Sequence, residues 1–366
     1  MDQFFRYLDG RASGVDAVLI RGLLRGGAYL YGMAIAIRNL AYDRGWKKAC
    51  TSEIPVVSVG NITTGGTGKT PFVALVVSEL QRAGVTPGIV SRGYGADSSG
   101  VNDEKRVLDR LCPGVPHRQN AHRAASIVQL IEESGVNSIV MDDGFQHRAM
   151  ARDLDIVLVD ACNPFGYGYL LPRGLLREPI HSLRRASLIL LTRCSLVSEK
   201  ELDETERVIR NELKEESIPI LRTMFEPTDL ISLKSERKSV QELSEQSCWL
   251  MCGIGNPDAF QSTCQAAGLK IVGQSVFPDH HHYRRADIER VLEQARNQGA
   301  ENIITTLKDL VKLPVNEDPV WALNIQPKFS CSTDETTFRA ALERTIAASS
   351  NGKFAKTDCP KVAGTQ

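Results

Sequence analysis

The stretch SVGNITTGGTGKTP, residues 58–71, has the residue types and spacing that a phosphate-binding loop requires. Its glycines allow the backbone to wrap tightly, and its lysine and threonine open a helical pattern whose N-terminal N–H groups attract phosphate oxygens. We expect Lys69 to reach the β- and γ-phosphates of a nucleotide, and the hydroxyl of Thr70 to bind magnesium. The expected nucleotide-binding residues are Thr63, Thr64, Gly65, Gly66, Thr67, Gly68, Lys69 and Thr70.

Thr63 stands where the usual phosphate-loop pattern has its first glycine. This weakens the pattern match but leaves the strand, the glycine-rich turn and the helix start in place. A dinucleotide site is one alternative, but it would need an acidic residue about 20 positions further on, and the residues around Ile89 offer none. A glycine turn that merely joins a strand to a helix is the other alternative. The Gly-Lys-Thr sequence favours the phosphate loop over both.

A second group of candidate functional residues follows the apolar run IVM at positions 139–141. It consists of the consecutive aspartates Asp142 and Asp143. Carboxyl ends of parallel strands meet at one edge of a sheet, so these carboxylates are expected near the phosphate loop. Magnesium at nucleotide sites takes one or two carboxylates in addition to phosphate oxygens. Asp142 and Asp143 are therefore the expected metal ligands, together with Thr70.

Three further polar clusters are not required by a fold. SRGYG contains Arg92 and Tyr94, PRGLLRE contains Arg177 and Glu178, and FPDHHHY sets an aspartate beside three histidines. Arginines stabilise the charge of a transferred phosphoryl group, although surface ion pairs are the alternative for each of them. A His-Asp pair can accept a proton from an attacking hydroxyl. Adjacent histidines in an extended segment point to opposite faces, which disfavours a metal site there.

Short apolar runs separated by helical patterns predict the elements that position these residues. The expected strands lie at 54–60, 88–93, 137–143, 155–160 and 187–192, and the pattern restarts beyond about residue 225. Runs that are apolar on both faces indicate a parallel sheet covered by helices on both sides. The expected fold class is α/β: a P-loop NTPase-like parallel-sheet domain, a second, smaller α/β domain and an N-terminal amphipathic helical segment.

The length of 366 residues favours two domains over one. We expect a basic, membrane-associated helical segment over 1–50, a P-loop domain over 51–225, a smaller α/β domain over 226–345 and a flexible tail over 346–366. The apolar stretch 26–37 is too short to span a membrane, which takes about 20 apolar residues. A basic helix on an anionic membrane surface and a helix docked on the protein body both remain open.

Composition narrows the classes of partner. The chain has 44 basic and 44 acidic residues, so its charge gives no reason to expect nucleic acid. Its nine cysteines are an odd number without paired short spacings, and we expect reduced thiols in a cytosolic setting. The oligomeric state does not follow from the sequence.

Taken together, these motifs resemble the tetraacyldisaccharide 4′-kinase family, the lipid A 4′-kinases. The resemblance runs from about residue 20 to 325 and rests on VGNITTGGTGKTP, SRGYG, NDE, MDDGFQHR, LLPRGLLREP, CGIGNP, FPDHH and TTLKDLVKL. It implies transfer of the ATP γ-phosphate, with Mg²⁺, to the 4′-hydroxyl of a tetraacyldisaccharide 1-phosphate. It also implies a peripheral protein at the cytoplasmic face of the bacterial inner membrane, with the lipid substrate and the membrane surface as partners.

The resemblance also implies roles for individual residues. Asp103 in NDE corresponds to the catalytic aspartate, His280 to its partner histidine, and Lys69 to the lysine of the phosphate loop. The implied substrate-contacting residues are Arg92, Tyr94, Glu104, Arg123, His147, Arg177 and Glu178. Arg118 is the alternative to Arg123, because it lies close by in the sequence.

This chain departs from the family pattern at two places. It has Asn102-Asp103-Glu104-Lys105 where the family usually has Gly-Asp-Glu-Pro, and Leu307 where the family has a glutamate in Thr-Glu-Lys-Asp. A membrane-associated P-loop ATPase switch of the partitioning or cofactor-insertion type is the main alternative function. Such a switch leaves FPDHH and the second domain unexplained.

Overall fold

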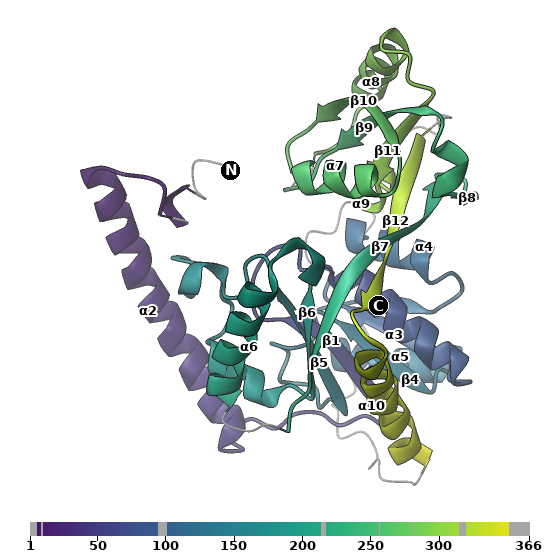
Figure 1. The fold of residues 1–366 in the computed structure, drawn as a ribbon. Helices are drawn as coiled ribbons and strands as arrows, with labels where there is room; N and C mark the ends of the chain where they lie inside the picture. The colour runs from purple at the N-terminus through teal and green to yellow at the C-terminus, as the bar shows by residue number, and fades with distance from the viewer. Residues whose placement is uncertain are drawn as a thin grey trace, which may run out of the picture. The chain divides into compact units, whose positions relative to one another are not determined.

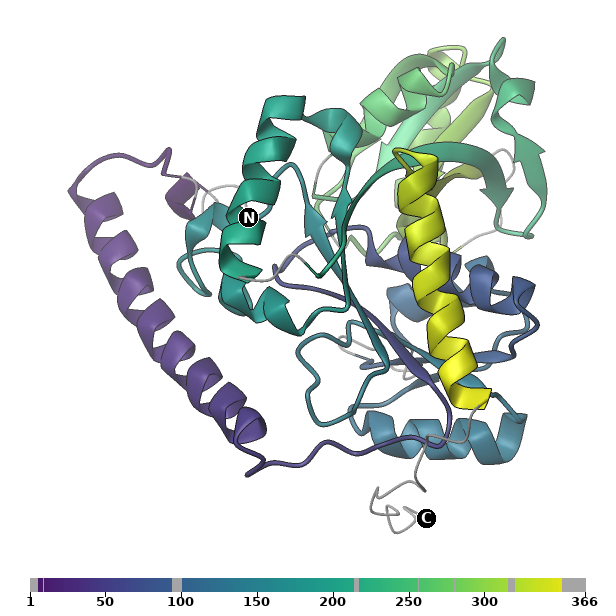
Figure 2. The same cartoon turned by 60° about the horizontal axis from the view of Figure 1, so that its bottom comes forward.

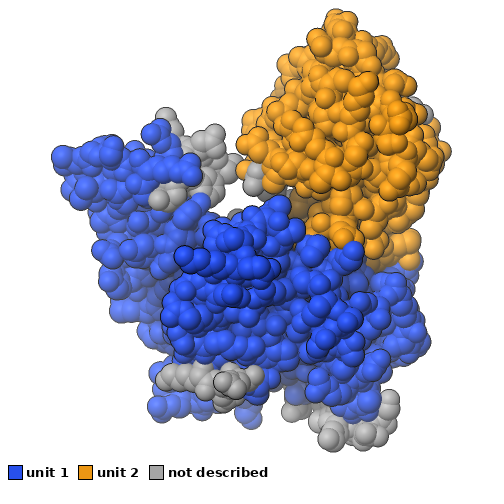
Figure 3. Space-filling view, in the orientation of Figure 1, with its two compact units in different colours: residues 1–92, 114–224, 328–366 blue, residues 93–113, 225–327 orange. Residues whose placement is uncertain are grey.

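The computed structural model describes residues 6–8, 10–93, 101–213, 217–255, 257–279, 281–314 and 320–350. The chain forms two compact units, coloured separately in Figure 3. Unit 1 comprises Met1–Arg92, Gly114–Met224 and Lys328–Gln366, and unit 2 comprises Gly93–Pro113 and Phe225–Pro327. The units differ from the linear organisation expected above in two places, because 93–113 belongs to unit 2 and the chain after Pro327 returns to unit 1.

Unit 1 is built on the expected parallel sheet. The strands are β1 (Val56–Asn61), β2 (Pro87–Ser91), β3 (His117–Gln119), β4 (Ser138–Asp142), β5 (Leu154–Asp160) and β6 (Leu188–Thr192). They follow the order β6-β5-β1-β4-β2-β3 and every neighbouring pair is parallel. All six residues of the central strand β1 are buried, including Ser58 and Asn61, as expected for a sheet covered on both faces.

Four helices of unit 1 are α3 (Lys69–Arg82), α5 (Arg123–Ser134), α6 (Glu199–Leu213) and α10 (Ser332–Ser350). Helix α3 begins at the lysine of the expected phosphate loop and ends just before Gly84, which adopts a positive φ of 76°. This confirms the strand, glycine turn and helix succession read from the sequence. Helix α10 covers the first part of the expected tail, and residues 351–366 lie outside the described residues.

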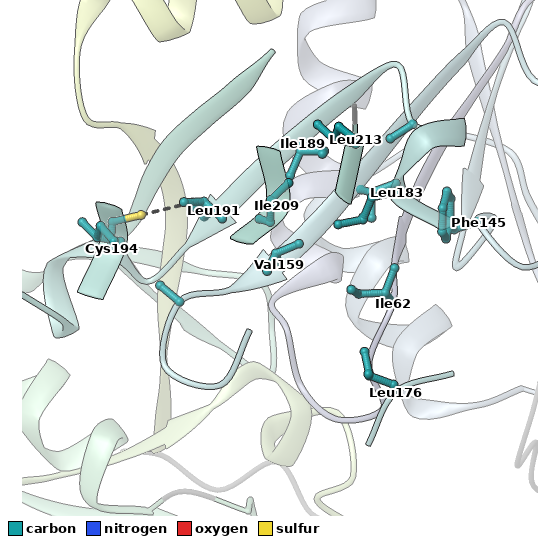
Figure 4. Close-up of a cluster of buried hydrophobic side chains, with 14 residues drawn as sticks. Ile62, Phe145, Val159, Leu176, Leu183, Ile189, Leu191, Cys194, Ile209 and Leu213 are labelled. Atoms are coloured by element: carbon teal, nitrogen blue, oxygen red, sulfur yellow. Dashed lines mark hydrogen bonds between the residues drawn. The ribbon is translucent and has the colours of Figure 1, made fainter. Parts of the chain in front are cut away.

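A buried cluster connects the phosphate loop to other parts of unit 1 (Figure 4). Ile62 at the entry to the loop, Phe145 after β4 and Leu176 from the segment after β5 all belong to it. The remaining labelled members are Val159, Leu183, Ile189, Leu191, Cys194, Ile209 and Leu213. The loop is therefore supported by side chains from widely separated parts of the sequence.

The N-terminal helix α2 (Val15–Asp43) runs along one edge of unit 1 (Figures 1 and 2). Ala17, Ala28 and Ile35 are buried on its inner face. Its outer face exposes large apolar side chains, namely Val15, Val18, Leu19, Leu23, Tyr29, Leu30, Met33, Ile37 and Leu40. Helix α2 thus docks on the protein body with one face and leaves an apolar face uncovered within unit 1. Within the described part of the chain, no helix is both long enough and apolar enough to cross a membrane.

Unit 2 contains a second, smaller parallel sheet. Its strands β9 (Ser247–Cys252), β10 (Lys270–Val276), β11 (Asn302–Thr306) and β12 (Val320–Phe329) follow the order β10-β9-β11-β12. Strand β7 (Ile220–Ser232) pairs with β6 in unit 1 and, further along, antiparallel with β8 (Arg237–Ser239) in unit 2. The helices of unit 2 are α4 (Asp103–Leu111), α7 (Pro257–Ala266), α8 (Arg285–Asn297) and α9 (Leu307–Leu310).

Packing explains why α4 belongs to unit 2 although it lies between two strands of unit 1 in the sequence. Val107 is buried in the core cluster of unit 2 together with Leu307 and Leu310. The guanidinium of Arg110 donates to the carbonyl oxygens of Ser232 and Leu233, at 2.9 and 3.1 Å. The sequence pattern alone does not reveal this exchange between units, because a short helix has the same local signals wherever it packs.

We expect Leu191→Ala to lower the free energy of unfolding by about 2–5 kcal/mol, because it leaves a cavity in the cluster of Figure 4. Leu196→Ala is the matched control, since that leucine is 59% exposed and Leu191 is fully buried. Urea unfolding followed by circular dichroism measures both. Equal losses in the two variants would contradict the assignment of the core.

Candidate functional site

The expected phosphate loop lies between β1 and α3. Two of its glycines adopt backbone conformations that would be strained for other residues. Gly65 has a φ of 111° and Gly68, the residue just before α3, has a φ of 81°. Both values lie in the region that favours glycine. Gly65 and Gly66 are exposed, whereas Thr63 and Thr67 are buried, with exposed fractions of 4% and 3%. The exposed turn at the N-terminus of α3 is the part of the loop open to a phosphate.

Asn61, the last residue of β1, holds the loop from within. Its fully buried side-chain amide donates to the carbonyl oxygen of Thr63 at 2.7 Å and to the hydroxyl of Thr67 at 3.0 Å. Its side-chain oxygen accepts from Lys69 Nζ at 3.3 Å. One amide therefore fixes both ends of the turn and the lysine that follows it. No sequence motif marks Asn61 for this role; its position at the end of a buried strand is the one sequence signal that points to it.

A second set of contacts holds the loop from β6. The hydroxyl of Thr192 donates to the carbonyl oxygen of Thr67 at 3.4 Å. Arg193 donates to the carbonyl oxygen of Gly66 at 2.6 Å and forms an ion pair with Asp160 at the end of β5. Neither residue has a sequence signal that marks it, since the contacts arise from the order β1-β5-β6 in the sheet.

Asp143 lies at the centre of a cluster of charges beside the loop. Arg177 Nη1 donates to its two carboxylate oxygens at 2.8 and 2.7 Å, and Lys69 Nζ lies 3.6 Å from Oδ1. Arg123 donates to its backbone oxygen at 3.0 Å. The backbone of Asp143 has a φ of 52°, a conformation that aspartate tolerates better than most residues. The structure thus brings Lys69, Asp143, Arg123 and Arg177 together.

Electrostatics keeps the carboxylate of Asp143 ionised. Burial raises its pKa, but the positive charges of Lys69, Arg177 and Arg123 together outweigh burial, so the pKa lies below its ordinary value. A charged carboxylate between two cations aligns them at the mouth of the loop.

The residues expected to bind magnesium fit that role by position and by chemistry. Val59 of β1 pairs in register with Asp142 of β4, which places Asp142 at the carboxyl edge of the strand beside the loop. Asp142 is 3% exposed, and Thr70 is half-buried in the first turn of α3. Hydroxyl and carboxylate oxygens are the hard ligands that Mg²⁺ takes beside phosphate. Asp143 is also engaged by Lys69 and Arg177, and Asp142 and Asp143 are both candidate ligands.

Arg123 and His147, both expected at the site, lie near this cluster. Arg123 is 2% exposed in the first turn of α5, whereas Arg118 forms a surface ion pair with Glu133, so Arg123 is the arginine directed to the site. Burial, together with the positive charges of Arg123, Arg152 and Arg92, lowers the pKa of His147 to about 4. The imidazole of His147 is therefore neutral near pH 7, able to donate one hydrogen bond and accept another.

Glu178 is one of the residues for which the resemblance implies a substrate contact. Its side chain is fully buried within unit 1, and its carboxylate binds Arg38 of α2 and Arg185. Glu178 therefore connects α2 to the segment that contains Arg185. Arg177, one residue earlier, binds Asp143.

In unit 2, Asp103 and Glu104 form the first turn of α4. The side chain of Asn102 caps this helix by accepting the backbone N–H of Lys105 at 2.9 Å. The family pattern described above has glycine and proline at these two positions, which supply neither that acceptor nor that donor. Asn102 and Lys105 therefore act together, and their hydrogen bond holds Asp103 at a helix N-terminus.

The second departure, Leu307, has a similar explanation. Its side chain packs in the core of unit 2, while Asp309 nearby is fully buried. Asp309 accepts from the backbone of Gly253 at 3.0 Å and from the hydroxyl of Thr306 at 2.8 Å. This loop therefore joins parts of unit 2. Tyr94 and His280, both expected at the site, lie outside the described residues.

The fold and site of unit 1 define a class of protein: a P-loop nucleotide-binding protein with a parallel sheet and a basic cluster beside the loop. Comparison with known proteins gives the family. The model of the tetraacyldisaccharide-1-P 4′-kinase family matches residues 20–347. The chain belongs to this family.

Individual relatives agree with this assignment. A tetraacyldisaccharide 4′-kinase of Anaeromyxobacter sp. is 37% identical over 76% of this chain and 78% of its own length. One of Chlorobaculum tepidum is 35% identical over 86% of this chain and 95% of its own. A crystal structure of LpxK from Aquifex aeolicus in complex with ATP is similar with a TM-score of 0.72, 28% identity, and coverage of 89% of this chain and 99% of that one. The membrane-associated ATPase switch is not favoured.

We expect the neutral state of His147 to make stability depend on pH. Its pKa is about 4 in the folded protein against an ordinary value of 6.5, so between these values the unfolded chain binds a proton that the folded chain does not. Stability contributed by this group is present above pH 6.5 and is lost as the pH falls towards 4. In His147→Gln, the free energy of unfolding should fall less steeply over this window than in the wild type. Identical slopes in urea titrations would contradict the shifted pKa.

Proposed function

We propose that this protein transfers the γ-phosphoryl group of ATP to the 4′-hydroxyl of a tetraacyldisaccharide 1-phosphate, a step in lipid A biosynthesis. The observation that carries the proposal is the cluster of Lys69, Asp143 and Arg177 beside the phosphate loop. Membership of the kinase family and similarity to an ATP-bound relative support the same activity and the use of ATP. The requirement for Mg²⁺ and the identity of the lipid are part of the proposal.

The residues of unit 1 would bind and neutralise the phosphates. Backbone N–H groups of Gly65, Gly66 and residues 68–70 would hold the phosphate oxygens, and Lys69 would offset negative charge on the β- and γ-phosphates. Arg177, oriented by Asp143, would stabilise the charge of the transferred group. Bound Mg²⁺, held by Thr70 and Asp142 with Asp143 close by, would supply additional positive charge to the phosphates.

Proton removal from the sugar hydroxyl would fall to residues of unit 2. Following the family pattern, we infer that Asp103 polarises His280, and that His280 accepts the proton of the attacking hydroxyl. The cap made by Asn102 supports this role, because it places the Asp103 carboxylate at the start of a helix. Glu104, Arg92, Tyr94, Arg123 and His147 are the proposed contacts to the disaccharide and its phosphate.

We further propose that α2 attaches the protein to a membrane surface at the cytoplasmic face of the bacterial inner membrane. Its uncovered apolar face supports this, because a face of this size on a surface helix is typical of binding to lipid or to another protein. The first fifty residues also carry eight basic against four acidic residues, which favours an anionic surface. Such attachment would hold the enzyme where an acylated substrate is found.

The function is tested by incubating the purified protein with γ-labelled Mg-ATP and tetraacyldisaccharide 1-phosphate in detergent micelles. We expect labelled bisphosphorylated lipid, and none with Lys69→Ala. Asp103→Asn should lower kcat by about 100-fold or more, the range of general base catalysis, with ATP affinity unchanged. ATP hydrolysis without labelled lipid would instead favour the ATPase switch, and an unchanged rate in Asp103→Asn would remove that residue from the mechanism.

Membrane attachment is tested by sedimentation with vesicles that contain anionic lipid. We expect the double variant Leu23→Asp and Leu30→Asp to bind these vesicles at least about tenfold more weakly, since it places two charges on the apolar face of α2. Leu196→Asp is the matched control, because Leu196 is 59% exposed and lies outside α2. Equal binding by the double variant and the control would contradict a membrane role for this face.

A further inference from the structure

One short segment connects α2 to the phosphate loop, and we call residues 169–178 the linking segment. On one side it pairs with the entry to the loop. The backbone N–H of Thr64 donates to Leu175 at 2.7 Å, the N–H of Arg177 donates to Ile62 at 2.7 Å, and Thr63 and Leu176 form an antiparallel bridge. Ile62 and Leu176 also belong to the same buried cluster (Figure 4). A shift of the linking segment would therefore shift the loop.

On its other side the linking segment contacts α2. The hydroxyl of Tyr31 donates to the backbone oxygen of Arg177 at 3.0 Å. Gly27 and Gly32 allow close approach, since a Cβ atom at either position would lie 3.1 or 3.0 Å from Pro172 or Leu170. Helix and segment are thus packed at several points along their length.

The strongest of these contacts is an ion pair between Arg38 of α2 and Glu178, which are 140 positions apart. Glu178 is fully buried, and the side chain of Arg38 is 30% exposed. Arg185 binds the other carboxylate oxygen at 2.6 Å. Burial raises the pKa of Glu178, but the charges of Arg185 and then Arg38 outweigh burial and keep it ionised. A buried carboxylate held by two guanidinium groups has a fixed orientation.

We propose that Arg38 is a positioning residue for phosphoryl transfer: through Glu178 it holds the linking segment so that the next residue, Arg177, stays on Asp143 beside Lys69. This inference rests on the proposed function. Arg177 reaches Asp143 at 2.7 Å, and small displacements of such a group reduce its stabilisation of a transferred phosphoryl group. Arg38 itself acts only through its neighbours.

The chain offers variants that separate positioning from folding. Arg38→Gln leaves Glu178 paired with Arg185, so no buried charge is left without a partner. Arg38→Lys keeps a positive charge that can reach Glu178. Arg21→Gln is the matched control: it removes the same charge from the same helix, but Arg21 donates to the backbone of Ala12 and not to the linking segment.

Kinetics of the full-length enzyme test the proposal. We expect Arg38→Gln to lower kcat by about tenfold, or ~1.4 kcal/mol of transition-state stabilisation, with KM for ATP and vesicle binding unchanged. Arg38→Lys should recover most of the rate, and Arg21→Gln should match the wild type. In an Arg177→Gln background, Arg38→Gln should cost almost nothing more, because the two residues act in series. The proposal would be overturned if the reductions in kcat from Arg177→Gln and Arg38→Gln multiplied in the double variant. It would also be overturned if Arg38→Gln changed only the KM for the lipid.

A second measurement does not depend on activity and so separates this proposal from the proposed function. Hydrogen exchange of the backbone amides of Thr64 and Arg177 reports on the pairing of the linking segment with the loop. We expect at least about tenfold faster exchange at these amides in Arg38→Gln and no change in Arg21→Gln. Unchanged exchange in Arg38→Gln would overturn the proposal even if the wild type is an active kinase. Absence of labelled lipid from the wild type would instead count against the proposed function.

Discussion

A phosphate loop cannot use for its own structure the backbone N–H groups that it offers to phosphates, so the surrounding protein has to hold it. In this protein the support comes from three directions. Asn61 binds both ends of the turn, Thr192 and Arg193 bind its carbonyl oxygens, and the linking segment pairs with its entry. Asn61, Thr192 and Arg193 bind carbonyl oxygens or side chains of the loop, and the linking segment accepts the N–H of Thr64, which precedes the glycines. The exposed glycine turn is therefore left to face a ligand.

Two acidic side chains hold the arginines near the phosphate loop in place. Asp143 and Glu178 are acidic centres 35 positions apart in the sequence, and each holds arginine side chains. Burying a charge is unfavourable unless it is paired, so each carboxylate fixes the geometry of the cations around it. Asp143 aligns two cations at the loop, and Glu178 joins α2 to the body of unit 1. The Asp143–Arg177 pair lies beside the phosphate loop, and the Glu178–Arg38 pair joins α2 to unit 1. Arg177 and Glu178 are consecutive residues, so the two pairs are connected through the backbone.

The differences from the family pattern also have physical explanations. Asn102 and Lys105 supply an acceptor and a donor that glycine and proline lack, so a capping hydrogen bond replaces the restriction that proline imposes on the backbone. Leu307 contributes to the core of unit 2 where the family has an acid. In this chain Asp103 lies in the capped first turn of α4, and Asp309 is held by hydrogen bonds from Gly253 and Thr306.

The sequence by itself determined the strand, the phosphate loop and α3, the parallel sheet of unit 1, and the position of Asp142 and Asp143 at a strand end. These follow from local backbone preferences and from periodicity, which a single segment carries. Only the tertiary structure decided that α4 packs in unit 2, that Asn61 and Arg193 hold the loop, and that Glu178 is buried against Arg38. Those contacts join residues far apart in the chain, and they exist only because the order of strands in the sheet and the docking of α2 bring those residues together.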